Sequence, residues 1–328
     1  MGRFYGHWGR ILMAHKRYCW VLLIVLACGT GGDPGSGAKN LPNPGFSPYT
    51  VHRDAMNETI GLLKSGGYGS PFARVEGESV ALYVHRCIED DCRIFRTHSD
   101  DGVHFDDPTQ PFPTLTDVRD PFVYSTTRGD VMYVVNSAHT QLLRISLLTP
   151  NRSTVLYSTA SDETVHEPSA VTIQGDTKVF GILKRNGQRQ LVQFSEDGPQ
   201  PVSFALCTDS DEACWARGEL FSAEVRGLRT QLGEMRYRLL FSIEGTAGQQ
   251  VLGFAQSADG YTWRNFPFNP SVESSSSLGS STHIRFGQRY FIYGEAGRRN
   301  PRVMAAINDQ GWPSMVWDRD PGPGMPED

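Results

Sequence analysis

The chain has 328 residues, of which 39% are hydrophobic and 20% are charged, and its formal net charge is −5 at pH 7. This length suits one large domain or two ordinary ones, and the negative charge leaves no basic footprint for nucleic acid. The sequence contains no Gly-rich phosphate loop, no dinucleotide fingerprint and no G-x-S-x-G motif, so it gives no support for a nucleotide enzyme, a serine hydrolase or a bound cofactor.

Residues 1–27 predict a secretory signal peptide. Basic residues precede an apolar run from Cys19 to Ala27, which is shorter than the roughly 20 residues that a helix needs to cross a bilayer. The run ends in VLAC, which resembles the lipobox of bacterial lipoproteins. This resemblance implies that the chain is cut before Cys28 and that Cys28 carries the lipid, palmitate among its acyl chains. The alternative is an ordinary signal with a buried cysteine.

Residues 28–45 predict a flexible tether, because they are rich in Gly, Ser and Pro and show no apolar period. Residues 317–328 have the composition of a disordered tail. No aspartate follows Cys28 directly, and in the sorting pattern of the lipoproteins this favours the outer membrane. We therefore expect a lipid-anchored protein of the bacterial cell envelope.

The remaining cysteines fall in two close pairs, Cys87 with Cys92 and Cys207 with Cys214. The first pair brackets a polar loop between two β-like runs, which places the sulfur atoms across the end of a hairpin. An oxidising compartment permits both bridges. A zinc site is the alternative, but the spacing lacks the CxxC motif that such sites use. We predict two disulfides and no metal.

Many short runs rich in Val, Tyr, Phe and Thr follow residue 66, separated by Gly, Pro, Asp and Asn. This pattern is typical of an all-β sandwich, barrel or propeller. A turn of the form S-x-D-G recurs at 99–102, 195–198 and 257–260, each time after a run that would be the third strand of a unit. A sandwich would not need the same turn in successive units, so we predict a five-bladed β-propeller over residues 46–316.

The acid-Pro and polar-Pro starts of the runs set the expected blade boundaries. Each blade is expected to hold about four strands, in keeping with the propeller architecture. The expected blades are 66–115, 116–160, 161–207, 208–270 and 271–316.

Two of these starts carry an acid, Asp120 in VRDPFVY and Glu167 in VHEPSAV. The layout resembles the five-bladed propellers of the arabinanase, xylosidase and invertase glycoside hydrolases. The resemblance implies three acids that face a central funnel from the innermost strands: a general base on the first blade, an orienting aspartate in Arg-Asp-Pro on the second, and a general-acid glutamate further on. Asp120 matches the second position and Glu167 resembles the third, so these are the candidate catalytic residues.

The first blade departs from this pattern. The family has Asp-Pro where this sequence has Ser70-Pro71, and a hydroxyl cannot act as a carboxylate base. Glycoside cleavage needs one carboxylic acid and one carboxylate, so three classes stay open. The chain is a hydrolase whose base comes from elsewhere, a glycan-binding propeller that has lost catalysis, or a protein-interaction lipoprotein.

Four further residues are candidates for contact with substrate, and each has a structural alternative. Arg119 can instead pair with a neighbouring carboxylate, and His166 can be a packed or hydrogen-bonding histidine. Glu295 is either part of a surface salt bridge with nearby arginines or an acid that helps to recognise a charged glycan. The candidates are Ser70, Arg119, His166 and Glu295.

Two acids of the fourth blade, Glu219 and Glu224, are less firmly anchored alternatives. The expected partners are a carbohydrate and, through the lipid, a membrane. We expect a monomer that binds no nucleic acid.

Overall fold

The computed structural model describes residues 50–51, 62–63, 66–89, 91–203, 216–229, 235–245, 250–265, 279–296 and 302–308. These residues form β-strands and loops, and none of them lies in a helix that is long and apolar enough to span a membrane. The signal peptide, the tether, the tail and the pair Cys207 and Cys214 lie outside this part of the chain.

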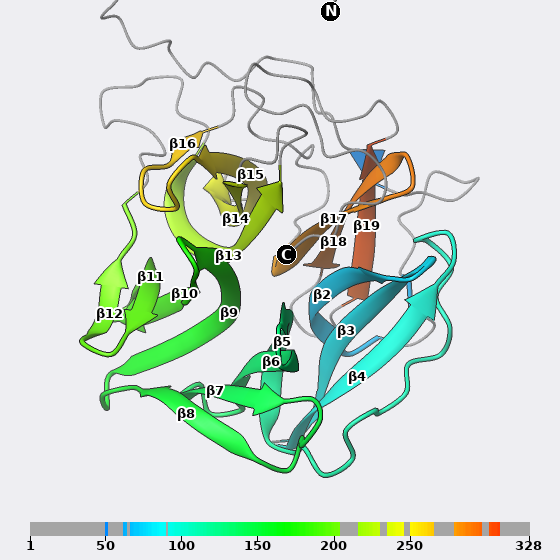
Figure 1. Cartoon of the computed structure of the whole chain (residues 1–328), viewed down its shortest axis with the longest axis horizontal. Helices are drawn as coiled ribbons and strands as arrows, with labels where there is room; N and C mark the ends of the chain where they lie inside the picture. The colour runs from blue at the N-terminus through cyan, green and yellow to red at the C-terminus, as the bar shows by residue number, and fades with distance from the viewer. Residues whose placement is uncertain are drawn as a thin grey trace, which may run out of the picture. The chain divides into compact units, whose positions relative to one another are not determined.

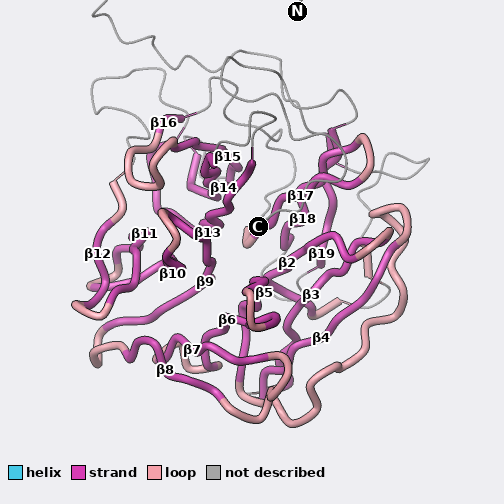
Figure 2. The backbone as a smooth tube through the Cα atoms, in the orientation of Figure 1, coloured by secondary structure: helices cyan, strands magenta, loops and turns pink. Residues whose placement is uncertain are grey.

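The strands form five antiparallel sheets arranged in a ring (Figure 1), and Figure 2 shows strands and loops alone in the described backbone. Blade one contains β2 (Tyr68–Glu76), β3 (Ser79–Ile88) and β4 (Asp91–Ser99). Blade two contains β5 (Val118–Thr126), β6 (Gly129–Asn136), β7 (Gln141–Ser146) and β8 (Ser153–Ser158). Blade three contains β9 (Glu163–Ile173), β10 (Asp176–Arg185), β11 (Gln188–Ser195) and β12 (Gly198–Pro201).

Blade four contains β13 (Ala216–Arg229), β14 (Met235–Gly245), β15 (Gln250–Ser257) and β16 (Arg264–Asn265). Blade five contains β17 (Ser281–Phe286), β18 (Arg289–Ala296), β19 (Arg302–Asn308) and β1 (Thr50–Val51). The first strand of each blade contacts the first strand of the next, from β2 through β5, β9, β13 and β17 back to β2. The predicted five-bladed propeller is confirmed, and β2 to β19 all fall within the expected blade ranges.

Two details differ from the prediction. Blade one has three strands, and an isolated bridge between Arg96 and Thr109 stands where a fourth would begin. Blade five takes its fourth strand from the N-terminal side of the domain, because Thr50 pairs with Ile307. A two-residue strand carries no periodic pattern, so the sequence offered no signal for β1.

The recurring turn is an Asp-capped loop in two of its three copies. The Ser99 hydroxyl accepts the N–H of Gly102 at 2.9 Å, and Asp101 Oδ1 accepts two further N–H groups at 2.8 Å. The same contacts recur around Ser257 and Asp259. Such side-chain caps satisfy backbone donors that no strand can reach. The third copy, at 195–198, is instead a tight hairpin between β11 and β12.

The glycine of each capped turn faces a neighbouring blade. Gly102 and Gly260 both have φ +79, a region that only glycine adopts at low cost. The carbonyl of Gly102 accepts the Tyr293 hydroxyl at 2.9 Å, and a Cβ on Gly260 would collide with the Ile173 side chain. The turns therefore pack blade one against blade five and blade four against blade three.

Replacing Gly260 with alanine should destabilise the propeller more than the same change at Gly187. Both glycines have left-handed backbones, with φ +79 and +80, but nothing lies within 4 Å of a Cβ on Gly187. Gly187→Ala should lower the free energy of unfolding by about 1–2 kcal/mol through backbone strain. Gly260→Ala should lower it by about 1–3 kcal/mol more, because the new methyl group overpacks the contact with Ile173. Urea unfolding of the two variants measures the difference, and equal losses would contradict the packing argument.

Candidate functional site

Ser70, Asp120 and Glu167, which each precede a proline, lie at matching bulges within their strands. The sequence had placed them at the starts of the strands. In blade two the pairing of β5 with β6 jumps from Arg119 to Phe122, which leaves Asp120 and Pro121 outside the ladder. The same shift separates Gly69 from Phe72 in blade one, and blade three skips the residues between His166 and Ser169. Proline fits such a bulge because no ladder donor is needed there.

The residue at the head of each bulge has a left-handed backbone. The φ angles are 43° for Ser70, 54° for Asp120 and 48° for Glu167. Non-glycine residues reach this region at a cost of about 1–2 kcal/mol. Strain repeated at the same place in three consecutive blades is typical of a functional site.

The bulges of blades one, two and three line one pocket, to which blades four and five also contribute side chains. Its cavity volume is about 30 Å³, which is enough for about two water molecules. A sugar would have to lie over the mouth and insert a substituent. The lining residues are Ser70, Pro71, Phe72, Asp120, Pro121, Phe122, Glu167, Pro168, Ala223, Glu224, Ser280 and Ser281.

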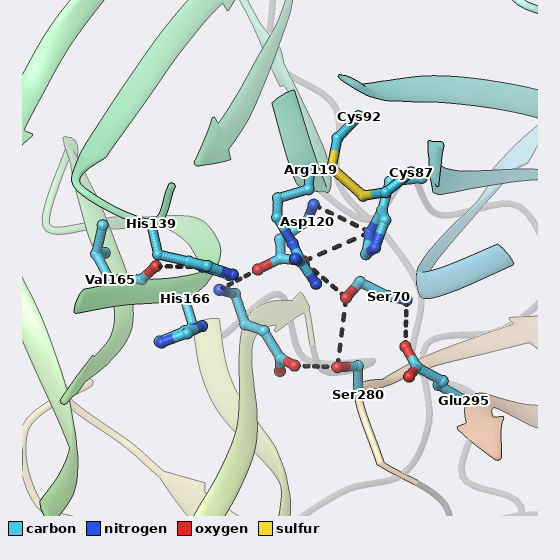
Figure 3. Close-up of polar contacts among 12 residues, drawn as sticks. Ser70, Cys87, Cys92, Arg119, Asp120, His139, Val165, His166, Ser280 and Glu295 are labelled. Atoms are coloured by element: carbon cyan, nitrogen blue, oxygen red, sulfur yellow. Dashed lines mark hydrogen bonds and ion pairs between the residues drawn. A yellow bond between two sulfur atoms is a disulfide. The ribbon is translucent and has the colours of Figure 1, made fainter. Parts of the chain in front are cut away.

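Asp120 is buried and is held by several donors (Figure 3). Its Oδ1 accepts the Ser70 hydroxyl at 2.7 Å and Arg119 Nε at 3.4 Å, while its Oδ2 accepts the backbone N–H of Glu167 at 3.3 Å. Burial is the largest single influence and raises the pKa of Asp120, but Arg119 and the nearby histidines together outweigh it, so the pKa lies below its usual range. Asp120 is therefore ionised at neutral pH.

Glu167 has the opposite character. Burial and the negative charge of Asp120 raise its pKa well above the usual value, although a hydrogen bond from the Ser280 hydroxyl opposes the shift. The Oγ atoms of Ser280 and Ser70 lie 3.4 Å apart (Figure 3), so two serines link the carboxyl groups of Glu167 and Asp120. The pKa values of the two carboxyl groups are therefore shifted in opposite directions, and Glu167 keeps its proton to higher pH than Asp120.

Three histidines surround Asp120. His85 Nδ1 lies 3.5 Å from Asp120 Oδ1, and burial lowers the pKa of His85 to about 4. The rings of His139 and His166 lie 4.0 Å apart between centroids. Burial also lowers the pKa of both, that of His166 to about 3, so all three imidazoles are neutral at pH 7.

The sequence offered His166 as a candidate for contact with substrate, with a packed or hydrogen-bonding histidine as the alternative, and it did not point to His85 or His139. His85 lies opposite Gly69 in the β2–β3 ladder, which becomes visible only once the strand register is known. Asp120, His139 and His166 each present one ligand atom, and these atoms all lie within 4.8 Å of one another. Within the described ranges, this is the one such group that could hold a metal ion.

Glu295 approaches the pocket from behind Ser70. Its Oε2 accepts the Ser70 backbone N–H at 2.9 Å, and a Cβ on Gly69 would lie only 2.6 Å from that oxygen. Gly69 is therefore required for the approach. Burial raises the pKa of Glu295, the N–H of Ser70 opposes the shift, and the charge of Asp120 adds to it. Of the arginines near Glu295 in sequence, Arg302 is exposed on β19, and residues 298 and 299 are outside the described ranges.

Glu224, a weaker candidate from the sequence, lines the pocket, whereas Glu219 pairs with Arg189 at 3.3 Å and does not. Glu224 accepts hydrogen bonds from Arg226 Nη2 at 2.8 Å and the Thr282 hydroxyl at 2.7 Å. Burial raises its pKa and Arg226 opposes the shift. Glu224 thus joins blade four to blade five beneath the pocket.

Sequence analysis did not single out Ser280, which lies in a serine-rich stretch with nothing to distinguish one hydroxyl from the next.

Cys87 and Cys92 form the predicted disulfide, directly opposite each other in the β3–β4 ladder.

Glu224→Ala should destabilise the domain by about 1–3 kcal/mol, because it removes the buried acceptor of hydrogen bonds from Arg226, the Thr282 hydroxyl and the N–H of His283. Glu78→Ala is the matched control, since Glu78 is exposed in the β2–β3 turn and surface changes usually stay within about 0.5 kcal/mol. Denaturant unfolding gives both values. A loss at Glu224 no larger than at Glu78 would contradict the assigned role.

No protein-family model matches the chain, and no curated protein matches it. Solved structures do. An α-L-arabinofuranosidase from Podospora anserina, solved in complex with cellotriose, matches with a TM-score of 0.56 and 13% identity, over 82% of this chain and 98% of that one. The catalytic domain of the family-62 α-L-arabinofuranosidase from Coprinopsis cinerea matches with a TM-score of 0.53 and 13% identity, over 80% and 96%.

A thermostable family-43 glycoside hydrolase matches with a TM-score of 0.50 and 14% identity, over 76% of this chain and 91% of that one. Identities this low establish the fold rather than the activity. The chain shares the five-bladed propeller fold of these glycoside hydrolases.

Proposed function

We propose that this protein is a glycoside hydrolase that cleaves carbohydrate at the bulge-lined pocket. The observation that carries the proposal is the pairing of Asp120 and Glu167, which equivalent bulges of neighbouring blades bring to one pocket. The shared fold supports it. A family-62 hydrolase with the same fold was solved in complex with xylotriose, with a TM-score of 0.54 and 11% identity.

Glu167 takes the role of general acid. It donates its proton to the glycosidic oxygen as the bond to the anomeric carbon breaks. Asp120 is a positioning residue, because its Oδ2 holds the backbone N–H of Glu167 and its charge faces the carboxyl group.

The base must come from a residue other than Ser70, whose hydroxyl already donates to Asp120. Glu295 lies on the side of Ser70 away from Asp120 (Figure 3) and accepts the backbone N–H of Ser70. In the proposed reaction, Glu295 accepts a proton from water while the water oxygen attacks the anomeric carbon. Glu167 gives its proton to the leaving oxygen, so one water is added across the cleaved bond.

A glycan-binding propeller is the second candidate, and one observation favours it. The position of the first-blade acid is filled by a neutral Ser70 that is locked to Asp120. A pocket kept only for binding could dispense with the base and retain its hydroxyls and acids.

The place of action belongs to the same proposal. The lipobox-like VLAC sequence supports acylation of Cys28, and residues 28–45 would tether the propeller to the membrane. The absence of an aspartate directly after Cys28 favours the outer membrane.

Glu167→Gln should lower the rate of sugar release by about 10²–10⁴-fold, the usual contribution of a general acid. The assay uses a panel of polysaccharides and aryl glycosides. An activated aryl leaving group needs no proton, so Glu167→Gln should keep much of its rate on that substrate, whereas Glu295→Gln should lose rate on every substrate. Glu78→Gln is the control.

Hydrolysis that survives Glu167→Gln on unactivated substrates would exclude the assigned acid. A panel that is bound but never cleaved by the unaltered protein would favour the glycan-binding candidate.

Cys28→Ala should abolish lipid attachment. The unaltered protein should fractionate with membranes and show an acylated Cys28 by mass spectrometry, and the variant should lose the acyl mass. An unaltered mature chain that begins elsewhere and carries no lipid would contradict the anchor.

A further inference from the structure

We propose that Asp120, His139 and His166 form a binding site for one divalent transition-metal ion, with zinc the best fit, beside the carbohydrate pocket. The site goes beyond the proposed hydrolase function and does not depend on it.

The three ligands come from different elements of blades two and three. Asp120 lies in the bulge of β5, His139 in the turn between β6 and β7, and His166 on β9. Their ligand atoms all lie within 4.8 Å of one another. Zinc held at about 2.0–2.1 Å places tetrahedral ligand atoms about 3.4 Å apart, so small side-chain rotations would complete the site.

His139 is fixed in the orientation that a metal ligand requires. Its Nδ1 lies 3.0 Å from the carbonyl oxygen of Val165, and because a carbonyl only accepts, Nδ1 carries the proton and Nε2 keeps its lone pair. The carbonyl of His139 accepts the N–H of Val165 at 2.8 Å. His139 reaches this double attachment with a left-handed backbone, φ +57.

His166 and Asp120 have supporting contacts of the same kind. His166 Nε2 lies 2.9 Å from the Thr164 hydroxyl, and donation to that oxygen leaves the Nδ1 lone pair for a metal. Asp120 is oriented by Ser70 and by the N–H of Glu167. Outer partners of this kind orient the ligands in known metal sites. Figure 3 shows both imidazoles on the same side of Asp120.

The donor set selects the class of metal. Two imidazole nitrogens and one carboxylate oxygen suit zinc and its first-row neighbours, whereas calcium and magnesium prefer oxygen alone. Three protein ligands leave a coordination position for water.

The test uses the purified full chain, stripped with a chelator and reloaded with Zn²⁺ or Co²⁺. We expect one equivalent of zinc after dialysis, by elemental analysis, and the visible absorption of a tetrahedral Co²⁺ centre. His139→Asn and His166→Gln should lose the bound metal. Asparagine tolerates the left-handed backbone at 139, and glutamine can keep a hydrogen bond to Thr164. Thr164→Val should weaken zinc binding by about 10–100-fold.

His104→Ala is the control, because His104 is an exposed histidine that pairs with Asp101 and its loss should leave metal content unchanged. Zinc content that is unaltered in His139→Asn and His166→Gln, or an unaltered chain that retains no zinc and gives no Co²⁺ spectrum, would overturn the site. If these variants fail to fold, the Co²⁺ spectrum and Thr164→Val decide the outcome. None of these measurements needs a substrate, so a failed metal site and a failed hydrolase are distinguished.

Discussion

The site depends on one backbone device, a bulge whose first residue is left-handed and whose second is proline. Blades one, two and three repeat it at Ser70, Asp120 and Glu167. A regular strand would alternate its side chains between the two faces of a blade. The bulge removes two residues from the ladder and turns the first toward the pocket, and proline gives up no hydrogen bond there. The chemistry of the pocket thus depends on which residue stands first in the bulge of blades one, two and three.

The two carboxyl groups lie in one pocket, but their surroundings shift their pKa values in opposite directions. Arg119 and several hydrogen-bond donors stabilise the ionised form of Asp120, whereas burial and the negative charge of Asp120 favour the protonated form of Glu167. Neutral hydroxyls from Ser70 and Ser280 fill the space between them. Because the surrounding imidazoles are neutral at pH 7, the arginine supplies the positive charge that keeps Asp120 ionised.

The blades and the acid-Pro positions were predictable because their signals are local. Strand runs, the S-x-D-G turns and the acid-Pro dipeptides each lie within a few residues. His139 was not predictable, because its place beside Asp120 depends on a turn docked onto the next blade. The sequence did offer Glu295 as a candidate, but its contact with Ser70 was not predictable, because that contact needs the space left by Gly69 more than 200 residues earlier in the chain.

The pairing of β1 with β19 has a consequence for how the molecule folds. Thr50 pairs with Ile307, so the edge strand of blade five comes from the N-terminal end of the domain. A chain that is synthesised from its N-terminus can form its middle blades early, but it cannot close the ring until residue 307 has been added. Contacts between such distant residues form late and slowly. Until then β1 lacks its partner strand, and an unpaired strand can pair with strands of other chains instead.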